Sequence, residues 1–235
     1  MNILVTGASK GVGFEVVKQF AKNSTNNIIA LSRDLESLQR LKRVCEDQYD
    51  NPINIYGIDF LSDSFGQDLE FILKDYKVHF DIIINNAGYL VNKPFTSTTG
   101  FDIDRTFKVN LFAPITIMQK MFPFLDDAKR CHIVNIGSMG GVQGSVKFPG
   151  LSAYSASKAA LASLTECLAE EYKEANVFVN CLALGSVQTE MLESAFPGYV
   201  AQVSAKEMGE YIVQFATQNP IYINGKVIPL SNSTP

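Results

Sequence analysis

The chain has 235 residues, of which 46% are apolar and 19% charged, as expected of one globular domain spanning residues 1–235. Its net charge of −4 and pI near 5.3 argue against nucleic acid as a partner, because nucleic-acid-binding surfaces are basic. No apolar run approaches the ~20 residues of a membrane-spanning helix, and the start MNILVTG lacks the basic residues of a signal peptide, so we expect no membrane partner.

Cysteine and histidine usage predicts neither a metal site nor a disulfide framework. The four cysteines are far apart without CxxC spacing, and the chain has two histidines. Each cysteine lies in an apolar or helical context, which favours buried free thiols. We therefore expect a reduced, cytoplasmic protein. The cysteines are Cys45, Cys131, Cys167 and Cys181.

Short apolar runs alternate with longer helical patterns, which is typical of βαβ units. Strands are predicted at residues 2–5, 27–31, 53–58, 81–84, 132–136, 177–182 and 221–227. Helices are predicted at residues 11–22, 34–47, 62–77, 100–124, 153–174 and 205–216. Pro114 should kink or break the fourth helix. The predicted fold is a single-domain, Rossmann-type α/β fold: a doubly wound parallel sheet of about seven strands with helices on both faces, and ligands at the carboxyl ends of the strands.

A glycine-rich turn, TGASKGVG at residues 6–13, follows the first strand and leads directly into a helix. Glycine lets the backbone approach a phosphate closely, and a helix N-terminus offers free N–H groups to the pyrophosphate of a dinucleotide. A tight strand–helix turn would also need glycine, but the position after an N-terminal strand favours nucleotide binding. The candidate cofactor-binding residues here are Gly7, Ser9, Lys10, Gly11, Val12 and Gly13.

The end of the second strand indicates which nicotinamide cofactor is bound. NAD-specific sites place an acid about 20 residues past the turn, on the ribose 2′-hydroxyl. Here the chain has Ser32 and Arg33, with Lys10 in the glycine-rich turn, which favours the 2′-phosphate of NADP(H) over NAD(H). Asp34 could instead bind an NAD ribose, but it also suits the N-cap of the following helix, the role we prefer.

The segment YSASK begins a helical pattern and places Tyr154 and Lys158 on one helix face. A tyrosine that acts as a base near pH 7 needs its pKa lowered by about three units, or about 4 kcal/mol. A lysine cation about 4 Å away supplies an interaction of that size. In the reduction direction the neutral tyrosine donates its proton. Ser138 ends the fifth strand, where its hydroxyl can hold a carbonyl oxygen as negative charge develops.

Five motifs in this order resemble the short-chain dehydrogenase/reductase family over essentially the whole chain: TGASKGVG, NNAG at 85–88, Asn110 in KVNLF, Ser138 with YSASK, and ALGSVQTEM at 183–191. The resemblance implies a catalytic tetrad of Asn110, Ser138, Tyr154 and Lys158, with Asn110 holding a water that relays protons from Lys158. It also implies further cofactor contacts from Asp59, Asn86, Ala87, Gly88, Val187 and Thr189. Asp59 could alternatively cap a helix, and the two asparagines could form a turn.

Three departures from the family pattern concern the substrate side. Leu184 stands where the family usually has a proline. Fifteen residues separate Ser138 from Tyr154, which is more than the family commonly has, and residues 190–206 form a short substrate lid. A short lid suggests an open site for a bulky or carrier-tethered substrate. The candidate substrate residues are Tyr89, Met139, Phe148, Gly185 and Met191.

The expected activity is reduction of a ketone, an aldehyde or a 3-oxoacyl thioester, since the layout looks most like the 3-oxoacyl-[acyl-carrier-protein] reductases. Lys129 and Arg130 could offer the basic surface that acyl carrier protein requires, although the acidic run at residues 170–174 weakens that hypothesis. The resemblance also implies a homo-oligomer, dimer or tetramer, paired through the long helices. The alternative is a catalytically silent nucleotide-sensing protein with the same fold.

Overall fold

The computed structural model describes residues 1–76, 78–126, 128–218 and 222–231. Within these residues seven strands form one sheet in the order β3-β2-β1-β4-β5-β6-β9, and every neighbouring pair is parallel. The strands are β1 (Asn2–Thr6), β2 (Asn27–Ser32), β3 (Asn54–Gly57), β4 (Ile82–Asn85), β5 (Cys131–Ser138), β6 (Val177–Leu184) and β9 (Val227–Leu230). The predicted doubly wound sheet is confirmed.

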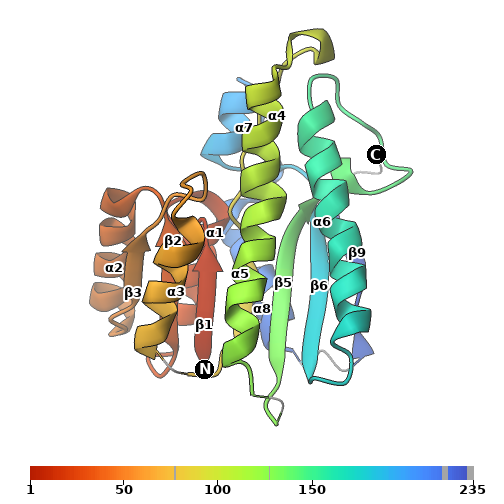
Figure 1. The fold of residues 1–235 in the computed structure, drawn as a ribbon. Coiled ribbons are helices and arrows are strands. Elements are labelled where there is room, and N and C mark those ends of the chain that lie inside the picture. The colour runs from red at the N-terminus through yellow and green to blue at the C-terminus, as the bar shows by residue number, and fades with distance from the viewer. Residues whose placement is uncertain (77, 127, 219–221, 232–235) are drawn as a thin grey trace.

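Helices cover both faces of the sheet (Figure 1). One layer holds α1 (Gly11–Ala21), α2 (Leu35–Tyr49) and α8 (Ala205–Thr217). The opposite layer holds α3 (Phe65–Tyr76), α4 (Gly100–Phe107), α5 (Ala113–Met121) and α6 (Ser152–Glu171). The short helix α7 (Glu190–Ala195) and the two-residue strands β7 (Val187–Gln188) and β8 (Val203–Ser204) lie beyond the carboxyl edge of the sheet.

Alternation along the strands explains why two apolar cores form. In β1, Ile3 and Val5 pack against the α1 side, while Leu4 packs against the α3 side. Successive side chains of a strand point to opposite faces, so an unbroken apolar run suits a sheet that is buried on both faces. Among the described residues no helix is long and apolar enough to cross a membrane.

The predicted boundaries need two corrections. The last strand was expected at residues 221–227 but runs over Val227–Leu230; Ile221 lies outside the described residues, and Gly225 just before the strand has a positive φ of 67°. The small β7–β8 pair was not predicted, since two residues carry no detectable alternation.

Pro114 interrupts the fourth helix as expected, through a change of helix type. A π-helical turn at Lys108–Phe112 joins α4 to α5. Proline has no N–H to donate to the carbonyl four residues earlier, which here is that of Asn110. The wider π turn accommodates the missing bond without ending the helix.

Candidate active site

The chain order of the sheet reverses beside β1, so loops from β1 and β4 meet at its carboxyl edge. Such a switch point is where open α/β sheets bind ligands. Gly7 and Gly11 adopt positive φ values of 65° and 57°, which explains glycine at both positions. At Gly7 a Cβ would lie 2.7 Å from the Cα of Ala87, so the two loops touch through their backbones.

Side chains from the NNAG motif hold the glycine-rich turn in place. The Asn86 Nδ2 donates to the carbonyl oxygens of Thr6 and Gly7, at 3.0 and 3.2 Å. The Thr6 hydroxyl accepts from the backbone N–H groups of Asn86 and Ala87, each at 3.0 Å. A Cβ at Gly13 would overlap the Gly7 carbonyl oxygen and the Asn86 side chain. These residues therefore support the turn directly.

The first turn of α1 offers an anion-binding end. Lys10 is its N-cap without a side-chain hydrogen bond, and no acidic residue lies within the first turn. The first N–H groups of a helix have no intrahelical partner, and its N-terminus carries a partial positive charge. This donor set fits the diphosphate of a dinucleotide, as the sequence predicts.

Asp34 is confirmed as a helix cap. Its carboxylate accepts from the Ser37 backbone N–H at 3.0 Å and from the Ser37 hydroxyl at 2.7 Å. These two hydrogen bonds hold the pKa of Asp34 below its usual value, with smaller contributions from Lys10 and Arg40. Nearby, the buried Ser32 hydroxyl donates to Ser9 at 2.8 Å, and Arg33 is exposed.

Arg40 is a cation that sequence reasoning missed. It lies in the second turn of α2, its guanidinium carbon is 5.2 Å from the centre of the Phe14 ring, and its charge lowers the pKa of Asp34. With Gly11 and Thr189 it lines a cavity of about 670 Å³ beside the start of α1. Its position in the second turn of the helix that Asp34 caps is the signal that could have identified it.

Ser138, Tyr154 and Lys158 converge at the carboxyl end of β5. Ser138 is the last residue of that strand, and Tyr154 and Lys158 lie in the first two turns of α6. The Lys158 ammonium donates to the Ile136 carbonyl at 2.7 Å and lies 5.9 Å from the centre of the Tyr154 ring. Burial lowers the pKa of Lys158 to about 8, which the neighbouring Cys181 partly opposes.

The expected lowering of the Tyr154 pKa is wrong for the protein alone. Burial raises the pKa of Tyr154, and a hydrogen bond with Ser138 acts in the opposite direction. The physical reason is that the Lys158 ammonium donates to a backbone carbonyl rather than to the phenol. The protein's own groups therefore keep Tyr154 neutral near pH 7, the form that can donate a proton.

Asn110 is fully buried in the π-helical turn, and its side chain connects two segments of the site. Its Oδ1 accepts from the Tyr89 N–H at 2.7 Å, and its Nδ2 donates to the Tyr89 carbonyl and to the Ser157 hydroxyl, both at 2.9 Å. Ser157 donates to the Tyr154 carbonyl at 2.7 Å. Asn110 thus links the loop after β4 to the first turn of α6.

The remaining predicted cofactor residues take structural positions at the same edge. Asp59 accepts from the Leu61 N–H at 3.0 Å in the turn after β3. Val187 pairs with Val203 in the small sheet, and Thr189 caps α7 by accepting from the Leu192 N–H at 3.3 Å. Gly88 lies beside Asn110.

The predicted substrate residues fall into two groups. Met191 and Phe148 are partly exposed; the Met191 methyl lies 3.7 Å from where a Cβ of Gly88 would be, and the Phe148 ring meets that of Phe196. Tyr89 instead stacks its ring against Arg105, whose guanidinium carbon is 4.5 Å from the ring centre. Met139 starts the 3-10 turn after Ser138, and Gly185 donates its N–H to the Leu230 carbonyl at 2.8 Å.

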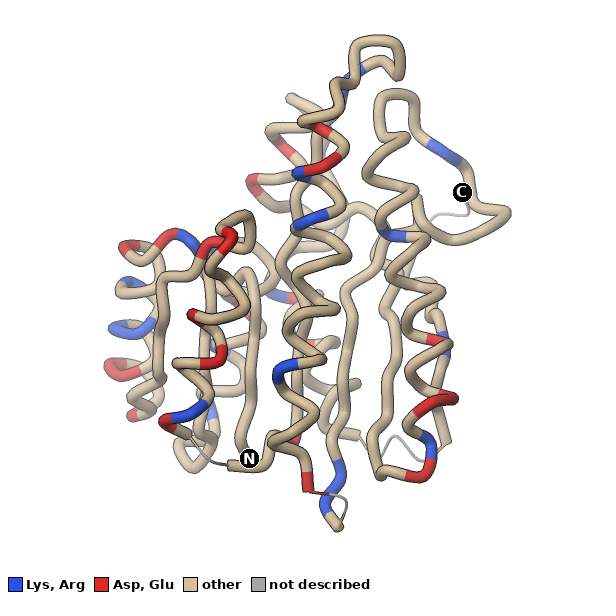
Figure 2. The backbone as a smooth tube through the Cα atoms, in the orientation of Figure 1, with Lys and Arg blue, Asp and Glu red and all other residues tan. Residues whose placement is uncertain are grey.

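The prediction that Lys129 and Arg130 lie near the site mouth is wrong. Both precede β5, at the amino edge of the sheet (Figure 2), whereas Ser138 ends that strand. Eight residues of extended chain separate Arg130 from Ser138 by about 26 Å. The acidic residues at the end of α6 lie at the same distant edge, beside the start of β6. Neither group bears on what approaches the site.

The cysteine prediction is confirmed for three residues. Cys45, Cys131 and Cys181 are buried free thiols, whereas Cys167 is exposed on α6. A helical context did not distinguish the outward face of that helix from its inward face.

Comparisons with known proteins agree with this geometry. A family model described as short chain dehydrogenase matches residues 1–199. The NADPH-dependent 1-acyldihydroxyacetone phosphate reductase of Saccharomyces cerevisiae is 36% identical over 195 residues, 81% of this chain and 62% of that protein. The L-xylulose reductase of Caenorhabditis elegans is 35% identical over 192 residues, 80% of this chain and 72% of that one.

A similar solved structure is that of 4-hydroxyisoleucine dehydrogenase complexed with NADH. Its TM-score is 0.86 at 24% identity, covering 99% of this chain and 97% of that one, a likeness of fold. The names of these similar proteins include both NADPH and NADH, so the family binds either nicotinamide cofactor. The family model, the two relatives and the doubly wound sheet agree: this chain is an oxidoreductase of the short-chain dehydrogenase/reductase family, which acts on CH–OH donors.

Proposed function

We propose that this protein reduces a ketone, an aldehyde or a 3-oxoacyl thioester with NADP(H), using Tyr154 as the proton donor. The observation that carries the proposal is the convergence of Ser138, Tyr154 and Lys158 at the carboxyl edge of the sheet, the edge where the glycine-rich turn also lies. When bound, the nicotinamide cofactor supplies the hydride. The alternative of a catalytically silent nucleotide sensor leaves this convergence without a role.

Each side chain has a separate task in this proposal. The Ser138 hydroxyl, already paired with Tyr154, holds the carbonyl oxygen as negative charge develops. Because the pKa of Tyr154 is raised, its O–H is intact near pH 7 and is given up to that oxygen. The Lys158 ammonium stabilises the phenolate that remains, since it is largely protonated below its pKa of about 8. The Asn110 side chain fixes the start of α6 through Ser157. The Asn110 backbone carbonyl receives no hydrogen bond from residue 114, because proline has no N–H, and this supports a role for Asn110 in holding a relay water.

The NADP(H) preference is supported by charge at the end of β2. The Asp34 carboxylate is engaged by Ser37, so it is poorly placed to bind a ribose 2′-hydroxyl. Arg33 is exposed, while Lys10 and Arg40 both act electrostatically on Asp34. These three cations near the end of β2, with the carboxylate of Asp34 already hydrogen-bonded, favour binding of a 2′-phosphate.

A titration of the protein with NADPH and with NADH, followed by nicotinamide fluorescence, tests this preference. We expect tighter binding of NADPH, lost in Arg33→Ala but retained in the control Arg43→Ala, which removes an exposed arginine farther along α2. Equal or tighter NADH binding that falls in Asp34→Ala would place the ribose contact on Asp34 and overturn the preference.

Turnover separates the proposed reductase from the nucleotide sensor. We expect carbonyl-dependent oxidation of NADPH by the wild type and a loss of at least a hundredfold in Tyr154→Phe, with nucleotide affinity retained. Nucleotide binding without turnover of any ketone, aldehyde or acyl thioester would favour the sensor. Docking of acyl carrier protein on Lys129 and Arg130 is not proposed further, because they lie far from the site.

We also propose one domain over residues 1–235, a cytoplasmic location and a homo-oligomer. Strands from both ends of the chain, β1 and β9, belong to one sheet, which supports a single domain. The free thiols support a reducing compartment. Phe112, 50% exposed at the junction of α4 and α5, and the small exposed residues of α6 support pairing through these helices. Sedimentation at several protein concentrations tests the assembly, with a concentration-independent monomer as the contrary result.

A further inference from the structure

Three segments adjoin residues of the candidate active site: residues 89–95 after β4, which begin at the Tyr89 that Asn110 binds; residues 142–151, which lie in the chain between Ser138 and Tyr154; and residues 191–200 around α7, which begin at Met191 beside Gly88. We call them together the active-site rim. The Lys93 N–H donates to the Gly150 carbonyl at 3.1 Å, and the Asn92 side chain donates to the Ala195 carbonyl at 2.9 Å. A Cβ at Gly150 would overlap the Asn92 side chain, so glycine is what allows these segments to meet. The rim is therefore a connected structure.

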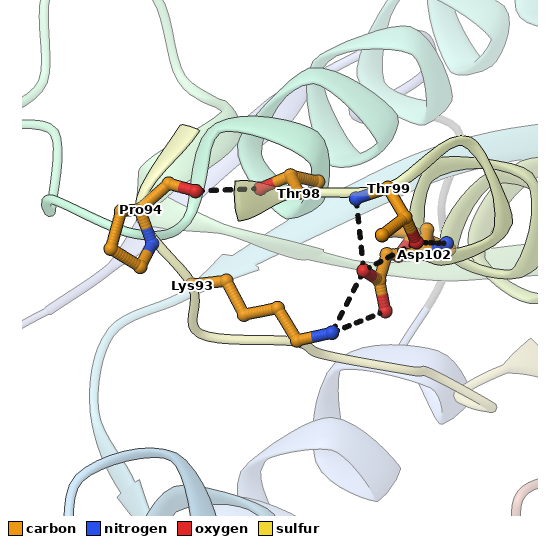
Figure 3. A network of polar contacts seen from close by, with 6 residues as sticks. Lys93, Pro94, Thr98, Thr99 and Asp102 are labelled. Carbon is orange, nitrogen blue, oxygen red and sulfur yellow. Dashed lines mark hydrogen bonds and ion pairs between the residues drawn. The ribbon is translucent and has the colours of Figure 1, made fainter. Parts of the chain in front are cut away.

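Lys93 fixes the rim to α4, the helix that leads into the π-helical turn of Asn110. Its ammonium binds both carboxylate oxygens of the buried Asp102 in α4, at 2.8 and 2.9 Å (Figure 3). The same carboxylate accepts from the Thr99 N–H and hydroxyl in a capping box. This network holds the pKa of Asp102 at about 2, so the pair stays ionised at any physiological pH.

The outer surface of the rim is apolar. Val146, Phe148, Met191 and Tyr199 are between 37% and 50% exposed. The rings of Phe148 and Phe196 meet edge to face, with 6.4 Å between their centres, and so join the loop before α6 to the segment after α7. Phe196 was not among the residues predicted from the sequence. Large exposed apolar side chains in one place mark an interaction site more often than scattered ones do.

The charged side chains of the rim each have an intramolecular partner, although Lys147 and Glu193 remain exposed. Lys93 binds Asp102, Lys147 donates to the Val142 carbonyl and the Ser145 hydroxyl, and Glu193 accepts from the Gly198 N–H. A substrate that reaches the rim meets the exposed rings and alkyl groups of Phe148, Met191 and Tyr199, beside charged side chains that already have partners in the protein. A polyhydroxylated substrate would lose water-bonded hydroxyls here without gaining partners, which is unfavourable.

We propose that the rim binds the hydrocarbon tail of the substrate, so that the protein acts on carbonyl compounds with a medium-length or long alkyl or acyl chain. This inference rests on the proposed reductase function and names its substrate class. The carbonyl lies at Ser138 and Tyr154, and the tail passes between Met191 and the Phe148–Phe196 pair. The tail, rather than a separate partner, is assigned as the occupant because the rim adjoins the site. Met191 lies beside Gly88, next to Asn110, and Phe148 belongs to the segment that joins Ser138 to Tyr154.

The test uses ethyl 3-oxoalkanoates, which keep one reactive carbonyl while the tail lengthens from 3-oxobutanoate to 3-oxodecanoate. We expect kcat/KM with NADPH to rise about twofold to fourfold for each methylene, the gain that follows from burying part or all of a CH₂ group. In Phe196→Ala the ratio of kcat/KM between esters that differ by one methylene should fall toward one. Phe71→Ala, which removes a ring 72% exposed on α3, is the control and should leave the series unchanged.

Each outcome distinguishes this inference from the proposed function. Turnover that is flat or falling with chain length, or a ketose reduced more efficiently than 3-oxodecanoate, would overturn the inference and leave the reductase intact. If neither these esters nor any other ketone, aldehyde or acyl thioester is reduced with either cofactor, the reductase proposal fails, and the rim is then tested by binding alone. Ligand-observed NMR should then show that wild type binds decan-1-ol more tightly than hexan-1-ol and that Phe196→Ala does not. The same affinity difference between the two alcohols in both proteins would refute the inference.

Discussion

Replacing the buried Lys158 by methionine should remove a charge whose burial lowers the free energy of unfolding. The pKa of Lys158 is lowered by burial from 10.5 to about 8, which corresponds to about 3 kcal/mol of destabilisation at pH 7. Methionine retains an unbranched apolar stem but leaves the Ile136 carbonyl without its donor, which costs about 2 kcal/mol. We therefore expect Lys158→Met to be more stable than wild type by about 1 kcal/mol at pH 7.

The pH dependence gives this prediction its sign. In wild type the folded lysine loses its proton near pH 8, whereas in the unfolded chain it keeps the proton to about pH 10.5. The unfolded state then binds more protons, so the stability contributed by this residue rises by about 2 kcal/mol between pH 7 and 9.5. Because methionine does not titrate, the advantage of the variant should reverse to a deficit of about 1 kcal/mol.

Urea unfolding followed by circular dichroism at pH 7 and 9.5 measures both values. The exposed Lys22→Met variant is the control and should show no pH-dependent difference from wild type. A Lys158→Met protein that is less stable by 2 kcal/mol at both pH values would refute the reasoning, because the ammonium would then be a net stabilising group. Loss of turnover in the stabilised variant would place the lysine among residues kept for chemistry.

Three further predictions concern other buried contacts. His132 has its Nε2 against the Asn180 amide and a pKa lowered by burial to about 4, so wild type should lose about 3 kcal/mol between pH 7 and 4 relative to His132→Gln in urea titrations. Gly13→Ala should lose about 1–3 kcal/mol and bind both nucleotides more weakly by fluorescence titration, because its Cβ overlaps the glycine-rich turn. Lys93→Met should raise the KM for the carbonyl substrate and not the nucleotide Kd; equal effects on both would count against its role in the rim.

The sheet was predictable because strands that are buried on both faces leave a strong signal. The run at 82–84 is purely apolar, the run at 132–136 holds three apolar residues with His132 and Asn135, and both became central strands. The last strand was misplaced because its sequence, VIPL, is short and contains a proline, while the segment before it is equally apolar. The π-helical turn at Asn110 was predicted only in part. Pro114 indicated that the helix is interrupted, but the sequence does not specify whether a kink, a break or a π-helical turn results.

Site residues could be predicted where they stand at the end of a strand or the start of a helix. They could not be predicted where the position depends on which end of a strand a neighbouring segment occupies. Ser138 and Tyr154 converge because one ends β5 and the other begins α6. Lys129 and Arg130 were misplaced because being near β5 in sequence did not specify which end of the strand they occupied. The pairing of Phe148 with Phe196 joins residues far apart in the chain, which a single sequence does not reveal.

The bonds from Asn86 to the glycine-rich turn have a consequence for how the protein is synthesised. They join residues 79 and 80 positions apart, so the turn after β1 receives its support only after the chain through β4 has been made. An emerging chain that ends before Asn86 contains the whole glycine motif yet lacks the groups that hold its shape. Nucleotide capture on the ribosome would therefore begin once β4 has docked beside β1, and a fragment ending at residue 80 would carry the motif without the affinity.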